Sequence, residues 1–247
     1  MMQPMEPVRP EPLRERNRAF YESLWSAVRL VEAERFNTWP LVRGMVAASK
    51  RRLEVAPGLR PRLPIRASHF VDLSLEATRE LAARGGDALC ACASALPYPD
   101  ASFDLVAAFD ILEHLEDDRA VTAELARITV PGGRLLLSTP LHPQRWTPFD
   151  DLVGHCRRYR PAELTRLLEG CGLAVEQSAV YGMQPRSGRW LDLGMWYLQH
   201  QRERALWWYD RVILPLATRF QSPLELRPGL IPTDGVDEIL LVCRRQA

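Results

Sequence analysis

The sequence predicts an α/β fold with a doubly wound, mostly parallel sheet of seven strands. From Leu53 onward, short apolar stretches typical of strands alternate with segments of helical spacing. The stretch Phe103–Phe109 is continuously apolar after Asp104, as expected of a strand covered on both faces. Hydrophobic residues make up 47% of the 247 residues and charged residues 26%, which excludes disorder along the whole chain.

The chain before this alternation divides into two predicted parts. Residues 1–18 carry four prolines among charges and are expected to form a flexible arm. Residues 19–50 have helical spacing, with Phe20, Leu24 and Val28 on one face, and a second helix is expected near Thr38 with Pro40 in its first turn.

The remaining residues, 51–247, are expected to form the α/β domain. We expect strands at 53–55, 68–72, 88–93, 103–109, 135–138, 173–180 and 238–243, and helices at 75–84, 118–128 and 160–169. Gly85-Gly86 ends the first of these helices, and Pro131-Gly132-Gly133 is expected to stop the second before the fifth strand.

A late segment, at about 184–236, does not fit the alternation and reads as a helical insertion. It holds four of the seven tryptophans, which are Trp190, Trp196, Trp207 and Trp208. Aromatic residues at this spacing fit a core or a homodimer interface, a lid over an apolar acceptor, or peripheral membrane contact beside Arg202, Arg204 and Arg211.

The composition and charge of the chain argue against several classes of binding partner and location. A formal net charge of +1 leaves no global basic field for nucleic acid. No window approaches the roughly 18 uncharged apolar residues of a transmembrane segment, and the first residues lack the apolar region of a secretory signal. Five unevenly placed cysteines indicate a reducing compartment, so a cytoplasmic location is expected.

Ligands of a doubly wound sheet bind beyond the carboxyl ends of its strands. The first expected strand holds Glu54 and ends in a tight turn at Pro57-Gly58, and the second ends at Asp72, which could accept hydrogen bonds from ribose hydroxyls. The third is followed by Cys92 and Ala93, and the fourth ends at Phe109. These residues are therefore expected to line one crevice.

The run LPYPDASFDLVAAFDILEHLEDD followed by VPGGRLLLSTPLHP, over Leu96–Pro140, resembles the class I S-adenosylmethionine (SAM)-dependent methyltransferases of type 11. The resemblance implies a Rossmann-like fold, SAM as cofactor and a small acceptor molecule, for which an apolar compound is one option. It also implies which residues surround the cofactor: Glu54, Ala56 and Gly58 for the methionine part, Asp72 for the ribose, and Cys92 and Ala93 for the adenine. Phe109 is expected beside the cofactor, past the fourth strand.

The chain departs from the family at the first turn. Ala56 and Arg60 replace glycines of the family pattern, and Pro61 and Pro64 prevent a helix directly after the turn. A pyrophosphate needs the amino end of such a helix, so NAD is disfavoured more strongly than SAM. Structural roles remain open for Glu54, as a partner of the turn, for Asp72, as a helix N-cap, and for Phe109, as core.

The expected catalytic residues are two histidines that follow the fifth strand, His155 and His142, since a base is needed if the acceptor must lose a proton. His155 could equally bind a loop carbonyl, and His114 is expected to act indirectly. Arg157, Arg158 and Arg160 are expected to form a solvated surface run, with an anionic acceptor as the alternative. Cys90 and Cys92 lack a second ligand pair, so no metal site is expected.

The predicted activity is methyl transfer from SAM to a small acceptor. A methyltransferase-fold protein that has lost turnover and serves as a binding or scaffold subunit is the leading alternative, because of Ala56, Arg60 and Cys92. The second alternative is an enzyme that uses the same pocket for another reaction, such as a cyclisation. An NAD-dependent oxidoreductase is the least favoured alternative.

Overall fold

The computed structural model describes residues 13–182, 194, 196–197 and 200–246. Its centre is a sheet of strand order β3-β2-β1-β4-β5-β8-β6-β7. The strands are β1 (Arg52–Val55), β2 (His69–Asp72), β3 (Asp87–Cys90), β4 (Phe103–Phe109), β5 (Thr129–Pro140), β6 (Leu173–Tyr181), β7 (Arg227–Pro228) and β8 (Glu238–Arg245). Neighbouring strands from β3 to β5 pair in parallel, whereas β8 runs antiparallel to both β5 and β6.

The sheet confirms the doubly wound α/β prediction, with two corrections. It has eight strands rather than seven within the described residues, because Arg227–Pro228 pairs with β6; two residues are too short to give a strand period. The Pro131-Gly132-Gly133 turn does not separate helix from strand. The helix ends at Ile128, and β5 begins at Thr129 and passes through those residues, with an irregular register opposite Phe103 and Leu105.

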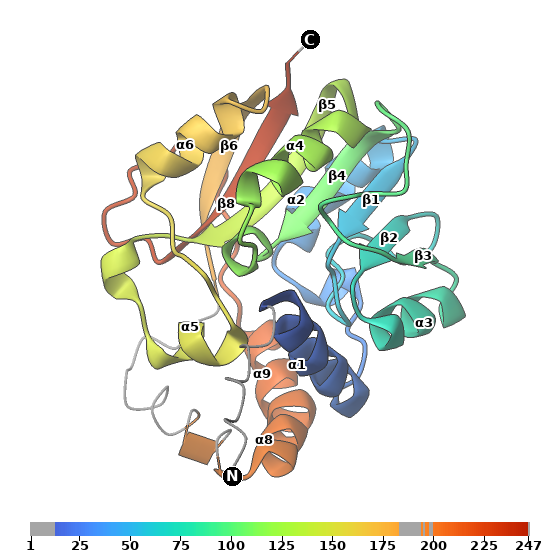
Figure 1. Cartoon of the computed structure of the whole chain (residues 1–247), viewed down its shortest axis with the longest axis vertical. Helices are drawn as coiled ribbons and strands as arrows, with labels where there is room; N and C mark the ends of the chain where they lie inside the picture. The colour runs from blue at the N-terminus through green and yellow to red at the C-terminus, as the bar shows by residue number, and fades with distance from the viewer. Residues whose placement is uncertain (1–12, 183–193, 195, 198–199, 247) are drawn as a thin grey trace, which may run out of the picture.

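Helices cover both faces of the sheet (Figure 1). On one face, α4 (Asp118–Ile128) and α6 (Pro161–Glu169) bury Val121, Leu125, Leu164 and Leu168 against strand residues. On the other, α2 (Trp39–Ala48) contributes Val42 and α3 (Leu75–Ala83) contributes Leu81. Apolar residues at three- and four-residue spacing therefore face the core, which is what the helix predictions rested on.

The parallel strands direct their carboxyl ends to one edge of the sheet, and further helices gather beyond that edge (Figure 1). They are α1 (Leu13–Ala27), α5 (Pro148–Val153), α8 (Arg202–Trp208) and α9 (Leu214–Arg219), and the π-helical η4 (Tyr209–Ile213) joins α8 to α9. Short 3-10 segments in other connections are η1 (Ala33–Arg35), η2 (Leu112–His114) and η3 (Pro143–Arg145). Among the described helices, none is both long and apolar enough to cross a membrane.

Two of the predicted segments differ from the structure at their limits. The flexible arm was expected to reach residue 18, but α1 already begins at Leu13; residues 1–12 lie outside the described residues. Of the predicted insertion at 184–236, residues 202–219 are helical and 227–228 form β7, while Trp190 falls outside the described part. The second helix has Thr38 before it and Pro40 in its first turn, as predicted.

Candidate functional site

The turn after β1 is tied to the end of β2. The Gly58 N–H donates to Asp72 Oδ2 at 2.8 Å, and the Ser74 N–H donates to Asp72 Oδ1 at 2.8 Å. Gly58 has φ +54° and Ala56 has φ +57°, so the turn uses left-handed backbone at both positions, and the alanine does so without the freedom of glycine. No helix forms over residues 56–68, all of which are described, in agreement with Pro61 and Pro64.

Asp72 is therefore a link between strands and not a helix cap. The cap of α3 is Ser74, whose hydroxyl accepts from the Ala77 N–H. Burial raises the pKa of Asp72 to about 6, although the N–H groups of Ser74 and Gly58 pull it down. A carboxylate has about four acceptor positions, so two backbone donors leave capacity for a ribose hydroxyl.

Glu54 forms structural hydrogen bonds to the loop after β1, which the sequence left open as its alternative role. Its side chain is buried, and its two oxygens accept the N–H groups of Arg62 at 2.9 Å and Leu63 at 2.8 Å. Burial raises the pKa of Glu54 to about 7, against the effect of these hydrogen bonds. Glu54 thus fixes the loop that replaces the missing helix.

The helix α1 covers the same turn. A Cβ added to Gly58 would lie 2.0 Å from the Trp25 ring, so the indole sits directly on the glycine. One turn earlier, the Tyr21 hydroxyl lies 3.1 Å from His114 Nε2. Glu22 accepts the N–H of Glu76 at 3.2 Å, at the start of α3. The helix α1 therefore contacts the turn after β1, the start of α3 and η2 at this edge of the sheet.

The other residues predicted to surround a cofactor lie at this edge. Cys92 and Ala93 follow β3 in a half-buried loop, where Cys92 Sγ lies 3.1 Å from Ser94 Oγ. Phe109 ends β4 and is 9% exposed; the Arg62 guanidinium lies 5.8 Å from its ring centroid and the Tyr181 ring 6.0 Å away. Phe109 therefore packs against neighbouring aromatic and cationic groups at the end of the sheet.

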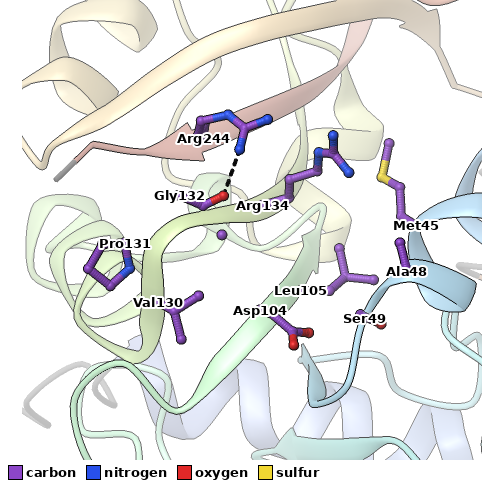
Figure 2. A pocket seen from close by; sticks show the side chains of 11 residues that line it. Met45, Ala48, Ser49, Asp104, Leu105, Val130, Pro131, Gly132, Arg134 and Arg244 are labelled. Carbon is purple, nitrogen blue, oxygen red and sulfur yellow. Dashed lines mark hydrogen bonds between the residues drawn. The ribbon is translucent and has the colours of Figure 1, made fainter.

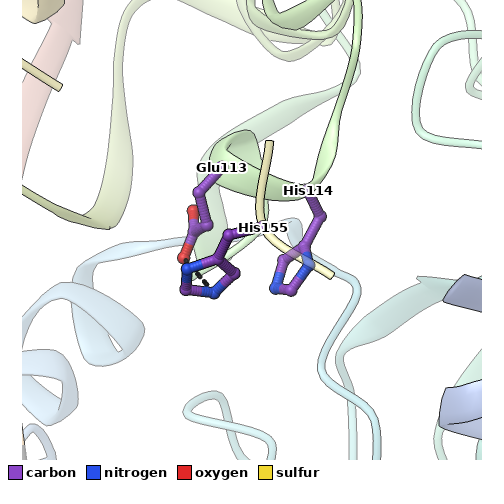
Figure 3. Close-up of side chains that lie close together, drawn as sticks. All are labelled: Glu113, His114 and His155. Carbon is purple, nitrogen blue, oxygen red and sulfur yellow. Dashed lines mark ion pairs between the residues drawn. The ribbon is translucent and has the colours of Figure 1, made fainter. Parts of the chain in front are cut away.

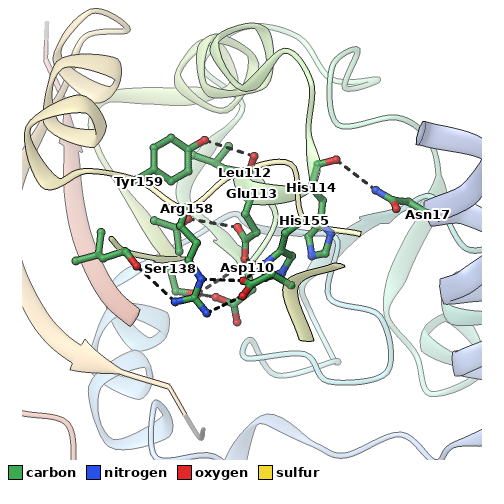
Figure 4. A network of polar contacts seen from close by, with 12 residues as sticks. Asn17, Asp110, Leu112, Glu113, His114, Ser138, His155, Arg158 and Tyr159 are labelled. Carbon is green, nitrogen blue, oxygen red and sulfur yellow. Dashed lines mark hydrogen bonds and ion pairs between the residues drawn. The ribbon is translucent and has the colours of Figure 1, made fainter. Parts of the chain in front are cut away.

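His155 is held by a carboxylate and not by a loop carbonyl (Figure 4). His155 Nδ1 lies 2.8 Å from Asp150 Oδ1, and Arg158 donates to both oxygens of Asp150 at 2.8 and 3.1 Å. Burial acts to raise the pKa of Asp150, but the hydrogen bonds from His155 and Arg158 outweigh it and hold that pKa below its usual range. The Arg158 side chain is fully buried, so the prediction of a solvated surface run is wrong for this residue.

His142 is placed differently. Its Nε2 lies 2.9 Å from the Thr233 carbonyl oxygen, and its backbone has φ +62°. The ring thus ties the loop after β5 to the segment before β8. Of the two predicted catalytic histidines, only His155 has a partner that orients its ring toward other ionisable groups.

Glu113, His114 and His155 form a cluster in which one ligand atom of each lies within 4.8 Å of the others (Figure 3). The two histidine rings meet edge to face, with centroids 4.6 Å apart. Burial lowers the pKa of His114 to about 3, and the neighbouring His155 adds to this effect. Burial raises the pKa of Glu113 well above its usual range, with the charge of Asp110 as the second cause.

A separate groove of about 240 Å³ lies at the opposite edge of the sheet (Figure 2). Asp104, near the start of β4, lines it together with Arg134 and Arg244, and Arg244 donates to the Gly132 carbonyl at 2.7 Å. Because it adjoins the amino ends of the parallel strands, this groove is remote from Asp72 and His155.

Sequence reasoning missed four residues of the site. Tyr21 and Trp25 come from a helix whose docking position no local pattern encodes. Asp150 belongs to a capping box with Thr147, so the Thr-x-x-Asp spacing was the available signal. Asp110 has φ +51° and its Oδ1 accepts from the Ser138 hydroxyl at 2.6 Å; nothing in the sequence marks that strained position.

The strand order, with β8 running antiparallel between β5 and β6, and the polar residues at the carboxyl edge are those of the class I methyltransferase fold. The model of a family described as a methyltransferase domain matches residues 58–137. A Mycolicibacterium smegmatis protein named "Probable S-adenosylmethionine-dependent methyltransferase" is 44% identical over 87 residues, which is 34% of this chain and 33% of that protein. The match thus spans about a third of that relative's own length.

A second relative and a solved structure are also methyltransferases by name. The demethylmenaquinone methyltransferase of Corynebacterium urealyticum is 34% identical over 123 residues, or 42% of this chain and 53% of that protein. The structure of a SAM-dependent methyltransferase from Thermotoga maritima superposes with a TM-score of 0.59 over 94% of each chain at 14% identity, which shows the shared fold. The chain is therefore similar in sequence to SAM-dependent methyltransferases over part of its length and shares their fold.

Proposed function

We propose that the protein transfers a methyl group from SAM to a small acceptor molecule at the carboxyl edge of its sheet. The observation that carries the proposal is the link between Asp72 and the Gly58 N–H, which joins the ends of β1 and β2 as a cofactor-binding crevice requires. The remaining acceptor capacity of Asp72 suits ribose hydroxyls, and the absence of a helix over residues 56–68 is compatible with a ligand that carries no phosphate.

SAM, when bound, supplies a methyl carbon activated by its sulfonium. Since the Trp25 ring lies on Gly58, α1 would have to shift for a ligand to reach that backbone. Glu54 would keep the turn in place during such a shift, because its carboxylate accepts hydrogen bonds from the backbone N–H groups of Arg62 and Leu63. We expect Cys92 and Ala93 at the adenine end and Phe109 beside the cofactor, past the end of β4.

We propose that His155 activates the acceptor. Asp150 accepts the Nδ1–H of His155 and thereby leaves the Nε2 lone pair free on the side of Glu113. Positioned bases typically accelerate a proton transfer by about 10²–10⁴-fold. His142 is left out of the proposed machinery because Thr233 occupies its Nε2.

An apolar acceptor is supported by the insertion helices. Asp210 of η4 pairs with Arg60 of the first turn at 3.1 Å and accepts the Arg29 N–H at 3.0 Å, so this segment borders the crevice. Large apolar side chains on it are exposed, namely Trp207, Trp208, Ile213, Leu216 and Phe220. One relative is named for demethylmenaquinone, an apolar acceptor of that protein. An apolar acceptor or a lid closing over it would cover part of this surface.

The alternative is a binding protein without turnover. It is favoured by the state of the first turn. Arg60 stands where the family has glycine and forms an ion pair with Asp210, and the Trp25 ring covers Gly58. In that case α1 would be a permanent part of the crevice.

The test is production of S-adenosylhomocysteine from SAM in the presence of small phenols and quinols. We expect turnover with at least one acceptor and a loss of about 10²–10⁴-fold in His155→Gln. His69→Gln is the control, because His69 lies at the amino end of β2, where it pairs with Asp87 of β3 at 2.7 Å. Equal rates in His155→Gln and the wild type would contradict the role of His155. S-adenosylhomocysteine binding without turnover on any acceptor would favour the alternative.

A further inference from the structure

We infer that Glu113, His114 and His155 form a binding site for a divalent transition-metal ion. Glu113 and His114 come from η2, directly after β4, and His155 comes from the loop after α5. Figure 3 shows the Glu113 carboxylate directed at the His155 ring, with the His114 ring beside it. Glu113 Oε1 lies 4.0 Å from His155 Nε2, and the three ligand atoms are within 4.8 Å of one another, so small side-chain movements would bring them around one ion.

The orientation of His155 is the first support. A metal-bound histidine usually donates its other ring N–H to a carboxylate, which fixes the ring and makes the ligating nitrogen more basic. Asp150 does this at Nδ1, 2.8 Å away, and Arg158 in turn fixes Asp150. His155 Nε2 then presents a lone pair, and at 4.0 Å it is beyond hydrogen-bond reach of Glu113.

The burial of Glu113 is the second support. Its side chain is 1% exposed, and Thr139 donates to its Oε2 at the long distance of 3.3 Å. A buried carboxylate is costly unless it is paired or binds a metal. A metal ion bound by Glu113 would pair this buried carboxylate.

His114 completes the set. Its Nδ1 is buried and makes no hydrogen bond of good geometry in the described part of the chain, with the Gly154 backbone near the ring. Its Nε2 lies 3.1 Å from the Tyr21 hydroxyl. If Nδ1 binds the ion, the Nε2–H can donate to the Tyr21 hydroxyl, so the ring keeps its existing partner.

Two imidazoles and one carboxylate are typical ligands for Zn²⁺ and its first-row neighbours, and three protein ligands leave positions open for a substrate. The role of the ion rests on the proposed methyl transfer. An acceptor hydroxyl bound to the ion would lose its proton to water more readily. The new O–C bond would form as the C–S bond of SAM breaks, with that electron pair going to sulfur and S-adenosylhomocysteine leaving. His155 would then activate the acceptor through the ion.

The experiment is calorimetric titration of the full chain, treated with a chelator and dialysed, with Zn²⁺, Mn²⁺ and Mg²⁺ separately. We expect one site per chain for Zn²⁺ or Mn²⁺ with a Kd of about 1 µM or tighter. Glu113→Gln and His155→Gln should each weaken it at least about 10-fold, while His69→Gln leaves it unchanged. Circular dichroism checks that each variant is folded.

A second readout is the visible spectrum of bound Co²⁺, which we expect to change in His114→Gln and His155→Gln. No saturable binding at millimolar metal, binding of Mg²⁺ alone, or equal affinity in the variants and the wild type would overturn the metal site. These measurements use neither SAM nor acceptor. Failure of the metal site therefore leaves the proposed methyl transfer standing, and failure to bind S-adenosylhomocysteine would be seen separately.

Discussion

Replacement of Gly58 by alanine is expected to destabilise the protein through two separable effects. At φ +54° an alanine side chain costs about 1 kcal/mol in backbone energy. The added methyl group would also lie 2.0 Å from the Trp25 ring, and overpacking of this kind costs about 1–3 kcal/mol. The sum is a loss of about 2–4 kcal/mol in the free energy of unfolding. Ala56 already adopts φ +57°, so backbone strain alone should not prevent folding.

The assay is urea denaturation of four proteins: the wild type, Gly58→Ala, Trp25→Ala and the double variant. In the Trp25→Ala background the clash is absent, so Gly58→Ala should cost only the backbone part, about 1 kcal/mol. The coupling energy between the two positions should therefore be about 1–3 kcal/mol. Equal costs of Gly58→Ala in both backgrounds would refute the packing of α1 on the first turn.

Three further outcomes are expected. Asp72→Asn should weaken S-adenosylhomocysteine binding about 10–100-fold by calorimetry, since hydrogen bonds to a charged group contribute about 1.5–3 kcal/mol; an affinity equal to that of the wild type would assign Asp72 to the turn alone. Arg158→Leu should cost about 3 kcal/mol in urea, because the buried Asp150 loses both hydrogen bonds from Arg158 and keeps only those from His155 and Thr147; a loss under about 1 kcal/mol would speak against this pair. Burial raises the pKa of Glu54 from 4.5 to about 7 on folding, so the folded protein binds this proton more tightly than the unfolded chain does. The free energy of unfolding should therefore fall by about 3 kcal/mol as pH rises from 4.5 past 7. Glu54→Gln should flatten that profile, and an unchanged slope would show that other groups cause it.

The fold was predictable where local patterns decide it. The strand Phe103–Phe109 and the helix Asp118–Ile128 have the predicted bounds, because a continuous apolar run and an amphipathic period are each complete within the element. The two-residue β7 has no period to detect. The irregular start of β5 depends on its pairing with β4, which the Pro131-Gly132-Gly133 signal does not contain.

The candidate site was predictable for the residues that follow strands and not for those that reach it through tertiary packing. Asp72 and Phe109 lie at the carboxyl edge because strand ends must meet there. Trp25 belongs to a helix that precedes Gly58 by more than thirty residues in the chain. Arg158 looked like surface charge, since the sequence does not reveal that Asp150 and Asp237 surround it. Buried ion pairs are made by partners distant in sequence, and residue type alone suggests exposure.

We expect the methyl-transfer cofactor to bind beyond the carboxyl ends of β1 and β2. Calorimetric titration of the full chain with S-adenosylhomocysteine tests this most directly. We expect saturable binding with a Kd in the micromolar range, about −8 kcal/mol, together with a rise in the melting temperature. No heat of binding and no thermal stabilisation at millimolar ligand would contradict it.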